Sequence, residues 1–125
     1  MIGNKYLKAL FEYSDEDTSF NQLLELLKTK DKNFLDSLYI SLNIDNCTKK
    51  ELKYLTKASA LIDYYLQLYD IKIPRWIRND KLEFDKPYYH SKRLTDFEKF
   101  KLLYISPAPF RIRNVYFELE GIKRI

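Results

Sequence analysis

Hydrophobic residues recur at intervals of three and four positions through the first seventy residues of the chain. This spacing places them on one face of an α-helix, because the helix repeats about every 3.6 residues. Short polar segments, such as the acidic "SDED" at 14–17, interrupt the pattern. The pattern therefore predicts four helices, at residues 4–13, 19–30, 32–43 and 49–69.

The helix at 49–69 has the longest pattern. Its apolar seam runs through Leu52, Leu55, Ser59, Ile62, Leu66 and Tyr69. A second side carries Tyr54, Ala58, Leu61 and Tyr65. A helix that is apolar on more than one side is buried among other elements, so this helix is predicted to lie at the centre of the fold.

Several helix starts carry capping signals. In a capping box, a Ser or Thr side chain and a Glu or Gln side chain three residues later satisfy free backbone N–H groups. Such pairs are Ser19 with Gln22, Thr48 with Glu51, and Thr95 with Glu98, and Asp31 can cap the helix at 32–43. The last pair predicts a fifth helix at 96–105, with Phe97, Phe100, Leu103 and Tyr104 on its apolar face.

After residue 70 the helical pattern stops until residue 95. Prolines at 74 and 87 and several aromatic residues indicate an ordered, irregular segment wrapped over the helices. Near the C-terminus, Pro107 and Pro109 favour an extended or turn geometry, and Phe110 can anchor that turn in the core. We predict an all-α fold: a compact helical bundle around one long central helix, with an aromatic-rich irregular segment and a C-terminal latch.

The length of 125 residues suits one domain with its own hydrophobic core. We expect a single domain over 1–125, in which residues 1–70 form the helical core and residues 71–125 pack on it. The charge divides at the same place. Residues 1–70 carry nine lysines and eleven acidic residues, whereas residues 71–125 carry thirteen basic and seven acidic residues, including every arginine of the chain.

This concentration of arginine has two interpretations. The planar guanidinium group suits paired contacts with carboxylates or phosphates, so the arginines could bind an anionic partner. Alternatively, they could pair internally with acidic residues, for which the candidates are Asp70, Asp80, Asp85, Asp96 and Glu118. The same choice applies to Arg111 and Arg113. They form either a partner-binding fork or part of the latch, in which they pair with carboxylates of the helical core at 1–70. Asn114 tolerates unusual backbone angles.

The residues needed for catalysis or for binding a metal or cofactor are sparse. Cys47 is the only cysteine and His90 the only histidine, and with two glycines the chain has no Gly-rich phosphate loop. The acidic run at 14–17 lacks the ligand spacing of a calcium loop. We therefore expect no enzyme activity, no metal and no cofactor. The single cysteine and the absence of a long apolar segment favour a cytoplasmic protein without a membrane span.

The segments "IPRW", "LEFDKPYY" and "LLYISPAPFRIRNVYFE" follow one another within residues 70–119. This order resembles a pattern in small bacterial proteins found beside nucleotidyltransferase-like toxins, with "SPAPFRIRN" as its distinctive core. The resemblance implies an antitoxin or antitoxin-like role and implies no catalytic residue.

Together these features predict a non-catalytic protein-binding module, antitoxin-like or an inhibitor of a bacterial enzyme, that binds an acidic protein surface. A phage-borne inhibitor belongs to the same class. The alternative is a nucleic-acid-binding or autoregulatory protein that contacts mainly phosphates and stacks bases on aromatic rings. The candidate binding residues are Arg75, Trp76, Arg78, Tyr88, Tyr89, Arg93, Arg111 and Arg113.

Overall fold

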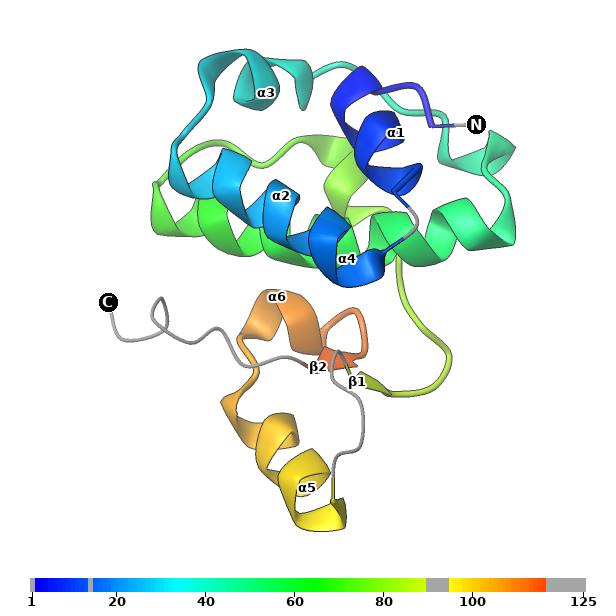
Figure 1. Ribbon diagram of the computed structural model, residues 1–125, viewed down its shortest axis with the longest axis vertical. Coiled ribbons are helices and arrows are strands. Elements are labelled where there is room, and N and C mark those ends of the chain that lie inside the picture. Colours follow the sequence, from blue (N-terminus) through cyan, green and yellow to red (C-terminus); the bar gives the residue numbers. More distant parts are fainter. Residues whose placement is uncertain (1, 14, 90–94, 117–125) are drawn as a thin grey trace.

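Figure 1 shows the fold in a computed structural model of the chain. The structure describes residues 2–13, 15–89 and 95–116, without the side chains of Glu16, Asp17 and Tyr104. The elements in this part of the chain are α1 (Lys5–Phe11), α2 (Glu16–Lys28), α3 (Lys32–Ser37), η1 (Ile44–Asn46), α4 (Lys49–Leu68), η2 (Arg75–Arg78), β1 (Tyr88–Tyr89), α5 (Asp96–Ile105), α6 (Ala108–Arg111) and β2 (Val115–Tyr116). The predicted all-α bundle around one long helix is confirmed.

Helix α4 crosses the middle of the molecule, with α2 in front of it and α6 on its lower side in Figure 1. Its start has the predicted capping box, in which Thr48 and Glu51 bond to each other's backbone N–H groups. Both predicted apolar sides of α4 pack in the core, because Leu55 and Ile62 on one side and Leu61 on the other are fully buried. The helix is therefore central, as its sequence predicts.

The N-terminal helices cover one side of α4. The Asn4 side chain caps α1 and also donates to the Ser37 hydroxyl at the end of α3, at 3.0 Å. Buried side chains from all three helices meet in the core, among them Leu7, Leu23, Leu27 and Phe34. The chain start is also fixed, since the backbone N–H of Ile2 donates to the Glu51 carboxylate.

Two N-terminal helices differ from their predicted bounds. Helix α2 begins at Glu16, so the predicted capping box at Ser19 is wrong: the Ser19 hydroxyl is inside the helix and donates to the backbone oxygen of Leu10. Acidic residues at a helix start interact favourably with its positive end, and this explains why Glu16 and Asp17 of the acidic run join the helix. Helix α3 ends at Ser37, because the N–H groups of Leu38, Tyr39 and Ile40 bond three residues back in tighter turns.

The irregular segment after α4 is held by specific bonds. The indole N–H of Trp76 donates to the backbone oxygen of Leu38, and Ile77 is fully buried. Further along, Phe84 and Tyr88 each donate a backbone N–H to the chain after α6, and β1 pairs in parallel with β2. The described part of the segment, residues 71–89, is thus ordered and packs on the helices, as predicted, and residues 90–94 lie outside the described residues.

The C-terminal latch contains a short helix, α6, which the sequence analysis did not predict. Phe110 on α6 is fully buried, in agreement with the prediction that it anchors the turn. Asn114 adopts a left-handed backbone conformation, with φ of 62°, and its side-chain amide donates to the backbone oxygen of Phe84. Because Ala108–Arg111 is helical, Arg111 and Arg113 point apart: Arg111 is exposed and Arg113 is buried.

Arg113 reaches the middle of α4 and pairs there with Asp63, whose side chain is fully buried. The Arg113 Nη2 atom lies 2.9 Å from one Asp63 carboxylate oxygen and also donates to the backbone oxygen of Ile77. Its Nη1 atom donates to the backbone oxygen of Pro109 at 2.7 Å. Arg78 donates to both carboxylate oxygens, and Gln67 donates to one of them. Asp63 belongs to the helical core at 1–70, so Arg113 pairs as the latch interpretation predicts, although Asp63 itself was not among the named candidates. The candidate Glu118 lies outside the described residues.

These contacts decide the charge states of the network. Burial raises the pKa of Asp63, but hydrogen bonds from Arg78, Gln67 and Arg113 outweigh burial, so the pKa lies below its usual value. Burial lowers the pKa of Arg113, and the Asp63 carboxylate opposes this effect. Both groups remain charged at neutral pH, because a guanidinium group keeps its proton throughout this range.

We predict that Asp63→Asn destabilises the fold by about 3 kcal/mol, because removal of one partner leaves a buried charge without compensation. Urea unfolding followed by circular dichroism measures the change. Asp45→Asn is the matched control, since Asp45 pairs with Lys81 at the surface and both side chains are mostly exposed. Equal, small effects of the two substitutions would contradict a structural role for Asp63.

The lowered pKa of Asp63 also predicts acid sensitivity. The ionised Asp63 carboxylate contributes fully to the free energy of unfolding above the unfolded-state pKa of about 3.9. This contribution is lost as the pH falls through the lower folded-state pKa. The free energy of unfolding of the wild type should therefore fall more steeply between pH 5 and pH 2 than that of Asp63→Asn. Urea titrations across this range measure both slopes, and parallel curves would contradict the prediction.

Candidate partner-binding surfaces

Two of the predicted binding residues lie inside the protein. Trp76 is 8% exposed and Arg113 is 3% exposed, and each donates to backbone oxygens of neighbouring segments. Neither side chain belongs to the surface. Trp76 follows Pro74, which directs η2 back over α3 and α4, and Arg113 follows the turn that ends α6.

The other predicted arginines are placed differently. Arg75 and Arg111 are exposed, whereas Arg78 pairs with Asp63 while its side chain stays 52% exposed. Arg78 also lines a small hollow of about 240 Å³, together with the exposed Ile112. Arg93 lies outside the described residues. Of the predicted arginines in the described part of the chain, Arg75, Arg78 and Arg111 are thus at the surface, and Arg113 is not.

The predicted tyrosines are half-buried in ring contacts. Tyr88 stacks on Phe84, with ring centroids 5.0 Å apart, and the Lys57 amine lies 4.8 Å from the Tyr88 ring centroid. The rings of Tyr89 and Tyr116 pack with their centroids 5.4 Å apart, and the Lys99 amine lies over the Tyr89 ring. These contacts order the two strands and leave part of each ring accessible.

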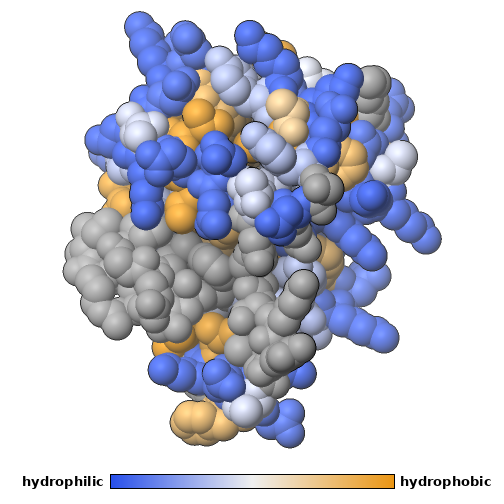
Figure 2. All heavy atoms as spheres, viewed as in Figure 1, coloured by the Kyte–Doolittle hydropathy of each residue, from blue (hydrophilic) through white to orange (hydrophobic). Residues whose placement is uncertain are grey.

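Helix α5 presents aromatic side chains to solvent. Its bounds and its capping box between Thr95 and Glu98 are as predicted. However, Leu102 is the buried one among the described side chains of this helix, while Phe97 is 73% and Phe100 56% exposed. Figure 1 places α5 at the end of the molecule farthest from α1 and α3, and Figure 2 shows hydrophobic atoms at this tip.

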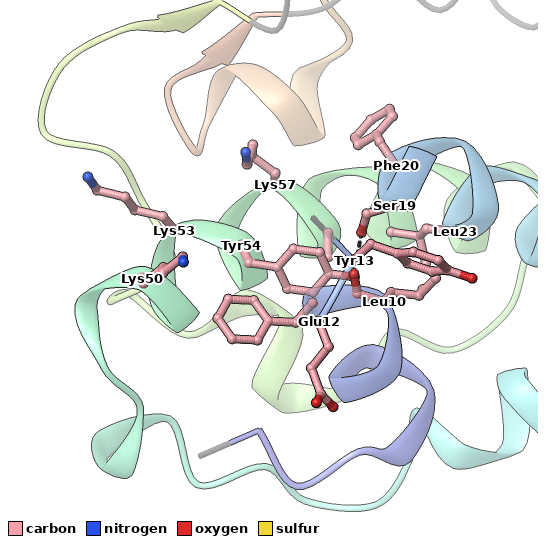
Figure 3. Close-up of a pocket in the computed structure, with 12 residues that line it drawn as sticks. Leu10, Glu12, Tyr13, Ser19, Phe20, Leu23, Lys50, Lys53, Tyr54 and Lys57 are labelled. Carbon is pink, nitrogen blue, oxygen red and sulfur yellow. Dashed lines mark hydrogen bonds between the residues drawn. The ribbon is translucent and has the colours of Figure 1, made fainter. Parts of the chain in front are cut away.

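A groove of about 590 Å³ opens between α1, α2 and the first half of α4. Its walls are mainly apolar and aromatic, and its lining residues are Leu10, Phe11, Glu12, Tyr13, Ser19, Phe20, Leu23, Lys50, Lys53, Tyr54, Lys57 and Ala58. Figure 3 shows the three lysines following one another along α4, with their amines outside the group of rings. These lysines form one edge of the groove. Their spacing in the sequence, at Lys50, Lys53 and Lys57, is a signal that the sequence analysis did not use.

Two polar side chains at the groove have shifted pKa values. Burial raises the pKa of Tyr54 to about 12, and the nearby Ser19 hydroxyl opposes the shift. The Tyr54 hydroxyl has no hydrogen-bond partner among the described residues, and the Ser19 hydroxyl donates to the backbone oxygen of Leu10. Partial burial lowers the pKa of Lys57 to about 8. Lys57 nevertheless donates to the Tyr88 hydroxyl at 3.3 Å, so the groove and the strands are linked.

Within the described residues, no group of three or more His, Cys, Asp or Glu side chains is arranged to hold a metal ion. No helix in this part of the chain combines the length and the apolar character needed to cross a membrane. Comparison with known proteins gave no match to a family model, a curated protein or a solved structure. The antitoxin resemblance of residues 70–119 therefore stays a prediction.

The lowered pKa of Lys57 predicts a rise in stability in mild alkali. Between pH 8 and the unfolded-state pKa of about 10.4 the unfolded chain binds more protons, so the free energy of unfolding increases with pH. Lys57→Met should lack this increase, whereas the exposed Lys53→Met should retain it. Urea unfolding at pH 7.5 and pH 9.5 tests the difference, and an unchanged rise in Lys57→Met would contradict the assignment.

Proposed function

We propose that this chain is a non-catalytic protein-binding module, antitoxin-like or an inhibitor of a bacterial enzyme, which binds an acidic surface of its partner. The observation that carries the proposal is the exposure of Phe97 and Phe100 on α5. These residues are three positions apart, so they share one face of the helix. Neighbouring exposed aromatic side chains mark interaction surfaces, where aromatic residues supply much of the binding energy.

Helix α5 also carries exposed basic side chains. Lys101 is four residues after Phe97 and shares its helix face, and Lys99 is exposed on the same helix. Around an apolar centre, such charges favour a partner with an acidic rim, and they speed association more than they add affinity. The resemblance of residues 70–119 to antitoxin-like proteins supports the same class of partner.

The described surface supports a protein partner better than a nucleic acid. Trp76 and Arg113 are buried, and Tyr88 already stacks on Phe84, so three of the candidates for base or phosphate contacts are committed internally. The experiment must therefore distinguish binding of a protein from binding of a nucleic acid.

The test is a pull-down from lysate of the bacterial host with wild-type protein and the double variant Phe97→Ser, Phe100→Ser. Burial of one Phe against a partner contributes about 2 kcal/mol, so the variant should recover at least tenfold less of a specific protein. The matched control is Ile40→Ser with Leu68→Ser, which removes two exposed apolar side chains elsewhere. Thermal melts first establish that all three proteins fold.

Equal recovery by the wild type and the α5 variant would overturn the α5 surface as the binding site. Recovery of nucleic acid alone, with binding that weakens steeply as salt increases, would favour the alternative function.

A further inference from the structure

We propose that the groove between α1, α2 and α4 is a binding site for a small amphiphilic carboxylate, whose acyl chain lies along the apolar walls and whose carboxylate meets the lysines of α4. This site is separate from the α5 surface, and it does not depend on the proposed function.

The size of the groove suits a small molecule. Its volume of about 590 Å³ lies within the range of roughly 300–1,000 Å³ that is usual for small-molecule sites. The edge from Lys50 to Lys57 is about 10 Å long, at a rise of about 1.5 Å per residue. The groove is thus large enough for an acyl chain.

The chemistry of the walls suits an apolar body. Leu10, Phe20 and Leu23 are buried and come from α1 and α2, while Ala58 is buried on α4. Figure 3 shows the ring of Tyr54 extending between these helices, with its hydroxyl on the side of Ser19. No charged side chain lies among these inner residues, so the inner part of the groove favours hydrocarbon over a polar group.

The charged side chains at the rim determine which charge of the ligand's head group is favoured. Lys50, Lys53 and Lys57 form one edge, and Glu12 is the acidic residue among the lining side chains. The net charge of the lining at neutral pH is therefore positive, and an anionic head group is favoured there. Lysine side chains place their hydrocarbon stems along apolar surface and their amines in water, so they can contact both parts of an amphiphile. A carboxylate beside the half-buried Lys57 would also stabilise its charged form.

The test uses decanoate as the probe, with isothermal titration calorimetry and backbone amide chemical shifts of the full chain. We expect saturable binding of one decanoate per chain, with shift changes centred on Phe11, Leu23 and Tyr54. The double variant Lys50→Glu, Lys53→Glu should bind at least tenfold more weakly, because both exposed lysines then repel the head group. The matched control Lys32→Glu, Lys86→Glu makes the same charge change at exposed positions outside the groove and should bind like the wild type.

Several results would overturn the proposal. They are the absence of saturable binding up to about 1 mM decanoate, shift changes centred elsewhere, or equal weakening in both variants. Binding of an acidic amphipathic peptide in the groove without binding of decanoate would also reject the carboxylate and assign the groove to a partner helix. Because all substituted lysines are exposed, a thermal melt close to that of the wild type is expected for each variant.

Discussion

Asp63 places a carboxylate in the middle of the central helix, where water cannot reach it. A buried charge is tolerated only with close partners, and the chain supplies them from two distant segments, η2 and the turn after α6. The same guanidinium group of Arg113 also donates hydrogen bonds to the backbone oxygens of Pro109 and Ile77. One carboxylate thereby fixes how the irregular segment and the C-terminal turn lie on α4. Well-packed hydrophobic residues in place of the whole Asp63–Arg113 pair could give similar stability, so the pair acts mainly to select one arrangement of the chain.

This arrangement determines which side chains remain for binding. Arg113 and Trp76 serve the fold, while α6 holds the chain against α4 and leaves α5 beyond the helical layer. Phe97 and Phe100 on α5 stay mostly exposed in this arrangement. On the opposite side of the molecule, α1 and α2 meet α4 without closing over its first turns, and this leaves the lysine-edged groove. The two candidate surfaces thus follow from the packing around α4.

Local sequence signals predicted the elements that depend on local interactions. The capping boxes at Thr48 and Thr95 gave the starts of α4 and α5, and the double apolar face of residues 49–69 identified the central helix. The prediction was wrong at Ser19, where a capping pattern lies inside a helix that acidic residues had started earlier. It also missed Asp63, although a lone carboxylate within an apolar helix is a recognisable signal. Its arginine partners are 15 and 50 residues away, so spacing alone could not identify them.

The sequence by itself determined the helical class, the central position of residues 49–69, the order of the irregular segment and the anchoring role of Phe110. These features follow from periodicity, caps and proline restrictions, which act over a few residues. The tertiary structure alone decided which arginines are buried, that α5 exposes its aromatic face, and that three lysines border a groove. Burial depends on what other segments place against a side chain, and contacts between residues far apart in the chain leave no fixed spacing in the sequence.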